Sequence, residues 1–144
     1  MHIEALRLSP GDDLRGALSA AWRALSTAHG VQAGCVVSAV GSLSVAQLRF
    51  ADAPGGTHIP GPLELLSLSG TFSADGPHLH ASVSRADGTV AGGHLLPGCT
   101  VRTTAEVVLA LLPGWQFIRQ LDAATGFVEL VAVRLPVAEG PAGS

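Results

Sequence analysis

Three histidines, His78, His80 and His94, are the residues whose types and spacing could do chemistry in this sequence. Successive side chains of a β-strand point to opposite faces, so a strand through His78–Arg85 places His78 and His80 on one face, about two rises of 3.3 Å apart. Ala86-Asp87-Gly88 is a typical turn between two short strands. A hairpin centred there pairs position 80 with position 94 or 95, at a cross-strand Cβ distance of roughly 5 Å. The sequence therefore predicts that three imidazoles converge.

Neutral imidazole is a good ligand for zinc and other borderline divalent metals, and three histidines with a water form a known open coordination pattern. Gly92 and Gly93 have no side chains, which leaves room beside His94 for a ligand or for another backbone segment. We therefore expect a divalent metal cofactor, with zinc as the first choice. An open fourth position permits Lewis-acid or activated-water chemistry. The alternative is that these are ordinary hydrogen-bonded strand histidines.

Two glutamates are candidates for orienting a histidine or for acting as a general base. Glu64 interrupts an apolar stretch, and Glu106 precedes the apolar run 107–112. Carboxylates that hydrogen-bond metal-bound histidines fix the orientation of the ring, and a positioned carboxylate can also transfer protons. The alternatives are a solvated edge acid for Glu64 and a salt bridge to Arg102 for Glu106. His58 could reach a metal, but its place in a Gly/Pro-rich segment favours simple exposure.

The elements that must position these residues begin with a weakly alternating strand at 2–8 and one amphipathic helix. Asp12 and Asp13 are typical capping residues before the helix, and His29-Gly30 is a typical helix end. The apolar residues between them recur at helical spacing. They are Leu14, Ala17, Leu18, Ala21, Leu25 and Ala28.

From Gly34 onward, short apolar segments separated by Gly, Pro and Asp predict strands. The predicted strands are Cys35–Val40, Ser44–Phe50, Leu63–Phe72, His78–Arg85, Thr89–Leu95, Val101–Leu112, Trp115–Leu121 and Phe127–Val133. Seven or eight strands with one long N-terminal helix indicate an α+β fold with a largely antiparallel sheet. The run 107–112 is apolar on both faces and predicts a central strand, covered by the helix and by a neighbouring subunit. The segment 52–62, with three prolines, is expected to be a surface loop.

The length and composition indicate one domain with partly apolar surfaces. The 144 residues suit a single domain, expected at 2–136, followed by a flexible tail at 137–144. Apolar residues make up 47% of the chain and charged residues only 13%, an unusually hydrophobic balance for a free-standing monomer. We therefore expect part of the surface to meet another subunit.

The charge and the cysteine content of the sequence limit which partners and which cellular compartment are expected. Eight arginines and eleven acidic residues give a net charge of -3, and the arginines are scattered singly, so the sequence does not predict a DNA-binding surface. Cys35 and Cys99 are each beside β-branched residues and are expected to be buried free thiols. No apolar run approaches the roughly 18 residues of a membrane span, and the N-terminus does not resemble a signal peptide, so a cytoplasmic location is expected.

Five short motifs follow one another along the chain. They are Gly41-Ser42-Leu43, the stretch 63–72, the stretch 75–80, Asp87-Gly88 with the stretch 92–95, and the stretch 103–107. In order and spacing they resemble the plants-and-prokaryotes-conserved (PPC) domain of the stand-alone bacterial and archaeal type, and the resemblance covers about residues 2 to 134. The resemblance implies a homotrimer with an antiparallel sheet and a metal held by His78, His80 and His94.

The same resemblance raises the question of whether the protein binds DNA. In plants a similar domain follows an AT-hook and mediates trimer formation and partner contacts, and prokaryotic members are labelled DNA-binding proteins by that analogy. This sequence contains no AT-hook, the segment that reads the minor groove, so we do not expect direct DNA binding.

Three hypotheses follow. The first is a cytoplasmic, homotrimeric metal-binding module with a regulatory role or a role in sensing a small-molecule ligand. The second is a zinc-dependent enzyme in which the three histidines hold the metal and Glu106 or Glu64 is the general base. The third is a transcriptional regulator that acts on DNA through a partner.

Overall fold

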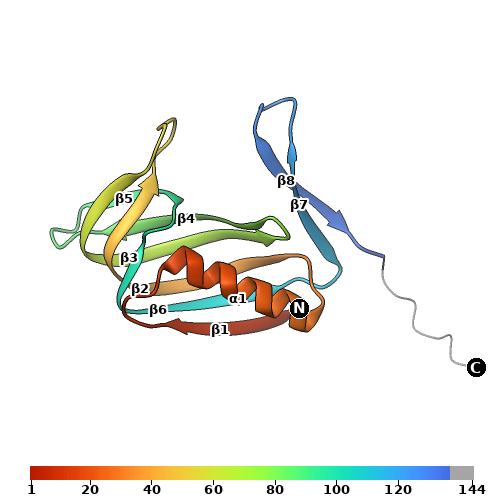
Figure 1. Ribbon diagram of the computed structural model, residues 1–144, viewed down its shortest axis with the longest axis horizontal. Coiled ribbons are helices and arrows are strands. Elements are labelled where there is room, and N and C mark those ends of the chain that lie inside the picture. The colour runs from red at the N-terminus through yellow and green to blue at the C-terminus, as the bar shows by residue number, and fades with distance from the viewer. Residues whose placement is uncertain (137–144) are drawn as a thin grey trace, which may run out of the picture.

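The chain folds into one helix and eight strands, an α+β architecture in which the strands form two sheets (Figure 1). The computed structural model describes residues 1–136, and the predicted tail at 137–144 lies outside this range. The elements are β1 (His2–Leu8), α1 (Leu14–His29), β2 (Gly34–Arg49), β3 (Thr57–Ser73), β4 (Gly76–Ser84), β5 (Val90–Leu95), β6 (Thr100–Leu111), β7 (Trp115–Leu121) and β8 (Val128–Arg134).

The main sheet has six strands in the order β1-β6-β2-β3-β4-β5, and every pairing is antiparallel. A further pairing joins the end of β2 to β5, through Leu48↔Leu95 and Arg49↔His94. The strands β2, β3, β4 and β5 therefore close on themselves at one end of the sheet. This closure matters for function because it brings β2 beside the predicted metal ligands.

The last two strands form a separate hairpin, so the prediction of a single seven- or eight-stranded sheet is wrong in this respect. The chain turns out of β6 at Pro113-Gly114, where Gly114 has a φ of 83° that favours glycine. β7 and β8 then pair only with each other as a two-stranded sheet, which stands beside the main sheet in Figure 1.

Helix α1 forms where the sequence predicts it and follows β1 instead of starting the chain. Asp13 caps it, because one carboxylate oxygen accepts a hydrogen bond from the Gly16 N–H at 2.7 Å. Gly30 ends it in the left-handed conformation, with a φ of 62°, and its N–H donates to the Ser26 carbonyl. Within residues 1–136 no helix is long and apolar enough to cross a membrane.

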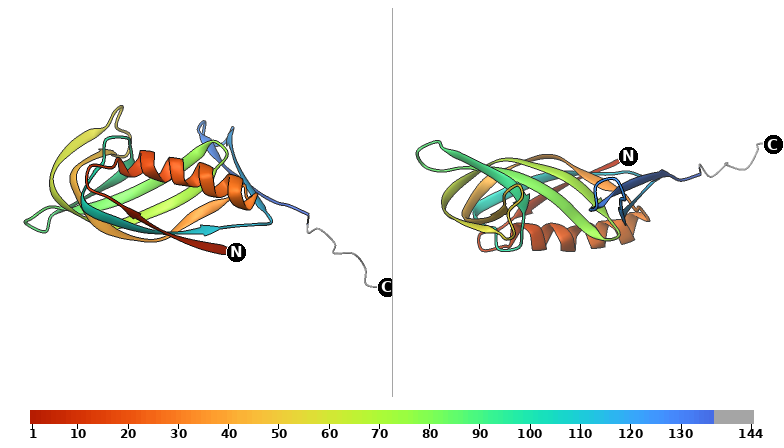
Figure 2. Two further views of the ribbon diagram at one scale, coloured as in Figure 1. Left: turned by 60° about the horizontal axis from the view of Figure 1, so that its bottom comes forward. Right: turned by 90° about the horizontal axis from the view of Figure 1, so that it is seen from above.

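The buried face of α1 covers one face of the main sheet, as the two views of Figure 2 show. Leu14, Leu18 and Trp22 are the buried residues of the helix. Trp22 lies four residues after Leu18 on the same apolar stripe but is not among the residues predicted for it, and its indole Nε1 donates a hydrogen bond to the Ser73 carbonyl at 2.8 Å. The helix is thereby tied to the turn between β3 and β4, just before the predicted histidines.

Strand β6 is a central strand, as predicted from its apolar run. It pairs with β1 on one side and with β2 on the other. Val107, Leu109 and Leu111 belong to the core, whereas Glu106 and Val108 point to the opposite face of the sheet. The expected cover of that face by a neighbouring subunit stays a prediction.

Two predicted element boundaries are wrong. The segment 57–62 belongs to β3 instead of a surface loop, and only 51–56 is irregular. Its prolines fit a strand here because this part of β3 pairs with β2 alone, from Thr57 to Pro60, so the missing N–H of a proline breaks no second ladder. The segments 35–40 and 44–50 are likewise parts of one long strand, β2, interrupted only by irregular pairing.

Candidate metal centre

The three histidines meet on one face of the β4–β5 hairpin, as the strand spacing predicts. His80 is the direct cross-strand partner of His94, and His78 is two residues from His80 on the same face of β4. The ring centroids are 5.2 Å apart for His78 and His80, 5.1 Å for His78 and His94, and 5.6 Å for His80 and His94. One ligand nitrogen from each ring lies within 4.8 Å of the others. The cluster could therefore hold a metal ion.

His94 has the chemistry expected of a metal ligand. Its Nδ1 is buried and has no hydrogen-bond partner among residues 1–136, which is costly for a polar atom unless a ligand or ion completes it. Burial is the main cause that lowers the pKa of His94 to about 4, and the charges of His78 and Arg49 act in the same direction. The ring is therefore neutral at pH 7, the form that binds a metal. These residues fit a divalent ion.

The pKa of His78 is also lowered, first by burial and then by the positive charges of Arg119 and His80. The carboxylate of Glu129 on β8 opposes this effect and raises the pKa of His78. Glu129 itself accepts a hydrogen bond from the Thr125 hydroxyl at 3.2 Å. The β7–β8 hairpin thus brings both a cation and an anion close enough to act on the cluster.

Neighbouring strands surround the histidines with polar side chains. Ser69 and Thr71 on β3 are the cross-strand partners of His80 and His78. The guanidinium of Arg119 on β7 donates a hydrogen bond to the Thr71 hydroxyl at 3.3 Å, and the Arg119 backbone N–H donates to the Asp75 carboxylate at 3.0 Å. These contacts fix Arg119 beside the β4 histidines.

Arg49 flanks the cluster on the other side. The additional pairing of β2 with β5 makes Arg49 the direct partner of His94, so the two side chains share one face. A row of paired residues therefore crosses four strands of the sheet. It consists of Ser69, His80, His94 and Arg49.

Two hollows open beside the histidines, and His80 lines both. The smaller has a volume of about 180 Å³ and is lined by Ser69, Gly70, Thr71, His78, His80 and Arg119. The larger has a volume of about 370 Å³, and Arg49, Phe50, Asp52 and His94 are among its lining residues. Gly92 and Gly93 also line it, as the sequence predicts for residues that leave room beside His94. A small molecule could therefore approach the cluster from either side.

The structure does not bring the two predicted glutamates to the histidines within one chain. Glu64 on β3 pairs with Ser42 and Ser84, and Glu106 on β6 pairs with Arg7 and Val40. Both side chains are exposed, and neither belongs to the group of potential metal ligands found among the described residues. Their suggested roles as orienting residue or base stay predictions.

His58 lies on β3, where it is exposed. Its Nδ1 is 3.1 Å from the Gln47 amide nitrogen. It is not part of the histidine cluster. Cys35 and Cys99 are free thiols, as predicted, although only Cys99 is fully buried.

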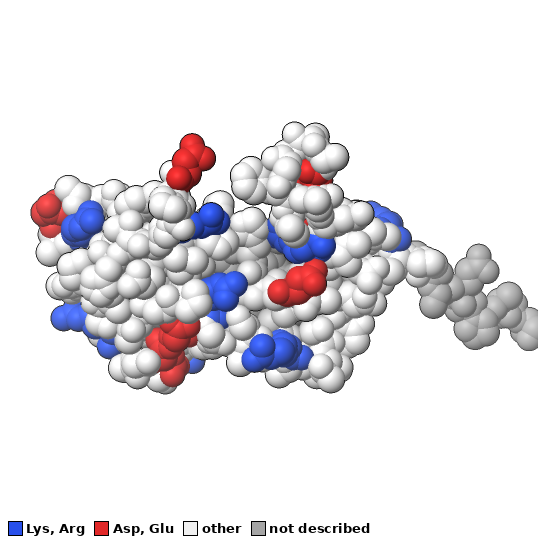
Figure 3. Space-filling view, turned by 45° about the horizontal axis from the view of Figure 1, so that its top comes forward, with Lys and Arg blue, Asp and Glu red and all other residues white. Residues whose placement is uncertain are grey.

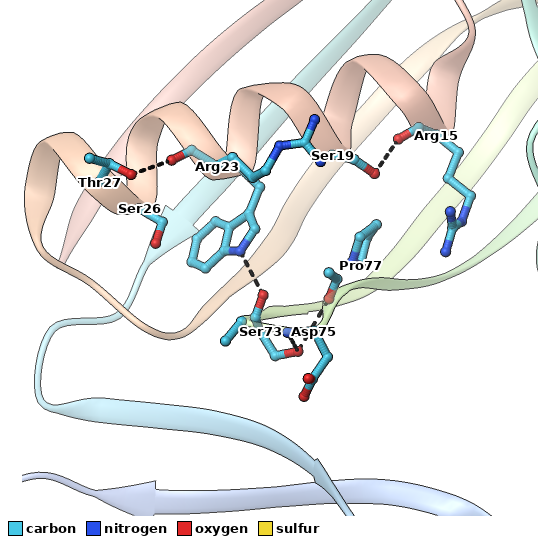
Figure 4. Close-up of a pocket in the computed structure, with 11 residues that line it drawn as sticks. Arg15, Ser19, Arg23, Ser26, Thr27, Ser73, Asp75 and Pro77 are labelled. Carbon is cyan, nitrogen blue, oxygen red and sulfur yellow. Dashed lines mark hydrogen bonds between the residues drawn. The ribbon is translucent and has the colours of Figure 1, made fainter.

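Another hollow lies away from the histidines. It has a volume of about 440 Å³ and lies between α1 and the β3–β4 turn, with Arg15, Arg23 and Asp75 among its lining residues (Figure 4). No histidine or cysteine lines it. The hollows beside the histidines are smaller, but they are the ones that adjoin a possible metal site.

Comparison with known proteins places the chain in a family. The model of the Plants and Prokaryotes Conserved (PCC) domain matches residues 1–113. A bifunctional protein GlmU of Synechococcus sp. (strain JA-2-3B'a(2-13)) is 50% identical over 130 residues, which are 90% of this chain and 20% of that protein. The chain thus spans about a fifth of the length of the curated relatives that it matches first.

Solved structures agree with this assignment. A protein from Salmonella cholerae-suis is 38% identical, with a TM-score of 0.84 and coverage of 92% of this chain and 94% of that one. A metal-containing protein from Archaeoglobus fulgidus is 29% identical, with a TM-score of 0.73 and coverage of 91% and 94%. The resemblance noted from the motifs is therefore confirmed, and this chain belongs to the Plants and Prokaryotes Conserved domain family.

Proposed function

We propose that this chain is a metal-binding, homotrimeric module that senses a small molecule or regulates a partner in response to one. The observation that carries the proposal is the convergence of three ring nitrogens within 4.8 Å, one of them buried without a hydrogen-bond partner in the described part of the chain. Zinc is the metal of choice because three neutral imidazoles and an open position suit its tetrahedral preference. The similarity to a metal-containing protein from Archaeoglobus fulgidus supports the binding of a metal ion.

The histidines and the residues around them would have different roles in this site. His78, His80 and His94 would hold the ion, which when bound supplies a Lewis acid with room for one more ligand. Burial is the main cause that lowers the pKa values of His78 and His94, and the positive charges of Arg119 and Arg49 act in the same direction. We favour binding over catalysis because Glu64 and Glu106 lie on other parts of the sheet within one chain.

Metal analysis of the purified protein tests the proposal. We expect about one equivalent of zinc per chain in the wild type after dialysis, and loss of the ion in His80→Ala, since two imidazoles bind zinc far more weakly than three. His58→Ala is the matched control, because His58 is an exposed histidine outside the cluster. A wild-type protein that holds no ion after incubation with zinc, or a His80→Ala variant that holds as much as the wild type, would refute the site.

A further inference from the structure

Two arginines flank the histidine cluster without forming an ion pair with any acid in residues 1–136. Arg49 is the cross-strand partner of His94, and Arg119 is held beside His78 by its hydrogen bond to Thr71. Glu129 influences His78, but it accepts its hydrogen bond from Thr125 and pairs with neither arginine. A guanidinium stays charged throughout the pH range of a folded protein, so each arginine adds a fixed positive charge to a site that would already hold a cation. The two arginines would therefore add fixed positive charge on both sides of a bound ion, while the nearby carboxylates of Glu129, Asp75 and Asp52 form no ion pair with them within residues 1–136.

The smaller hollow combines this charge with hydrogen-bond donors. Arg119 lines it together with the side chains of Ser69 and Thr71, and His78 and His80 form its wall toward the cluster. The Thr71 hydroxyl accepts its hydrogen bond from Arg119, so its own proton is free to be donated. No acidic residue lines this hollow. A volume of about 180 Å³ suits one small oxyanion with its hydration.

The larger hollow has a different character. It contains Asp52 as well as Arg49, and the ring of Phe50 adds apolar surface. Charge of both signs beside an apolar ring suits the body of a small molecule better than a bare anion. His80 lines both hollows, so a ligand in either one lies beside the cluster.

From this arrangement we infer that the ligand of the site is a small molecule with a carboxylate or phosphate group, and that Arg119 binds this oxyanion in the smaller hollow. With an ion held by the histidines, one oxygen would be free to bind it, and the others would accept hydrogen bonds from the Arg119 guanidinium and the hydroxyls beside it. Arginine suits this role because its planar fork matches the geometry of carboxylate and phosphate oxygens. The inference rests on the proposed metal binding.

Titration of the cobalt-loaded protein with two simple probes tests the inference. Cobalt(II) replaces zinc in such sites and has visible absorption bands that change when an anion enters its coordination shell. Acetate represents a carboxylate and methylphosphonate represents a phosphate group, with chloride used to hold the ionic strength constant. We expect a saturable spectral change in the wild type with at least one probe. The stronger probe identifies the class of oxyanion.

Arginine variants then assign the binding residue. Arg119→Gln is expected to weaken the binding of that probe about tenfold or more, since it removes charge-assisted hydrogen bonds. Arg49→Gln is expected to weaken it less, because Arg49 lines the other hollow. Arg23→Gln is the control, since Arg23 lies on α1 and lines the separate groove of Figure 4.

The possible failures are distinguishable. If the wild type binds no cobalt, the proposed metal site itself is wrong. If cobalt binds but neither probe changes its spectrum saturably, or if Arg119→Gln binds the probe as tightly as Arg23→Gln, the metal site stands and the oxyanion inference is overturned. If Arg119→Gln loses its metal, Arg119→Lys is the variant to test, because lysine keeps the positive charge but cannot donate two parallel hydrogen bonds to an oxyanion. Several-fold weaker binding by that variant supports the inference, and wild-type affinity overturns it.

Discussion

His94 occupies the most constrained position of the three histidines. It lies between His80 on β4 and Arg49 on β2, and its Nδ1 has no protein partner within residues 1–136. Burial, followed by the charge of His78 and then that of Arg49, lowers its pKa to about 4. The fold thus keeps this ring unprotonated at any pH near neutral, at the expense of stability whenever the solution is acidic.

The metal-free protein should therefore become less stable as the pH falls from about 6.5 toward 4. In this window the unfolded chain binds a proton at residue 94, with an ordinary histidine pKa of roughly 6.5, whereas the folded ring does not. His78 contributes in the same direction, since its pKa is also lowered. Urea unfolding in the presence of a chelator at pH 7.5 and pH 5.5 measures the effect. We expect His94→Gln to reduce the difference between the two midpoints and His58→Gln to preserve it. An unchanged difference in His94→Gln would contradict this account.

Local sequence signals could predict the histidines but not the arginines. His78, His80 and His94 follow from the two-residue period of a strand and from one turn signal, both of which act within 20 residues. Arg49 reaches His94 only because β2 pairs with β5, and Arg119 reaches His78 only because the β7–β8 hairpin packs beside β3. Such long-range pairings leave no periodic pattern in the sequence. The sequence alone therefore could not identify Arg49 and Arg119 as parts of the site.

At the scale of the elements, β5 is a short strand that fits between β4 and β2. A Cβ on Gly93 would lie 2.6 Å from the Arg49 carbonyl oxygen, and a Cβ on Gly92 would lie 3.2 Å from the Ala81 carbonyl oxygen. Only a residue without a side chain at 93 lets β2 approach this closely. The two glycines before His94 therefore allow the close strand packing that places His94 between β4 and β2.

Gly93→Ala should disturb the site without removing a ligand. The added methyl group must push β5 away from β2, and we expect the free energy of unfolding of the metal-free protein to fall by about 1–3 kcal/mol. The displacement of His94 should also weaken metal binding by about tenfold or more, because a ligand shifted by a fraction of an ångström no longer meets the ion in good geometry. Urea unfolding and competition with a chelator measure the two effects. Gly55→Ala, where nothing lies within 4 Å of the new Cβ, should leave both unchanged. Equal results for the two variants would show that the close approach does not matter.

Element prediction succeeded where the local signals agreed and failed where they competed. The helix has a cap at Asp13, an apolar stripe and a glycine end, and all three agree. In 57–62 the prolines and glycines indicate a loop, but the apolar side chain of Ile59, which is buried, favours a strand. The strand forms because that segment needs only one pairing partner, β2. The sequence of the segment does not reveal how many partners it has.

At the scale of the whole molecule, residues 1–136 of a single chain leave one face of the main sheet uncovered. α1 covers the other face, as Figure 2 shows. The outer face of β1, β6 and β2 carries Ile3 and Val40, which are 52% and 54% exposed, with Val108 partly buried between them. On the face drawn in Figure 3, arginines and acidic residues are interspersed among uncharged ones. The mixed charges on that face do not favour contact with the phosphates of DNA, and the apolar outer face of β1, β6 and β2 suits contact with another protein surface.

We expect the protein to be a trimer in solution, with the outer face of β1, β6 and β2 in the interface. Light scattering after gel filtration should then give three times the chain mass of 14.5 kDa. Val40→Glu should shift the protein toward the monomer, because the new carboxylate faces Glu106, its cross-strand neighbour, and burying two like charges in an interface is strongly unfavourable. Val90→Glu is the matched control, since Val90 is 56% exposed at the start of β5, beside the hairpin turn and away from this face. A wild-type monomer would overturn the expectation of a trimer. A Val40→Glu variant that stays trimeric would instead move the interface to another surface, for which the β7–β8 hairpin, with exposed Phe127 and Val128, is the next apolar choice.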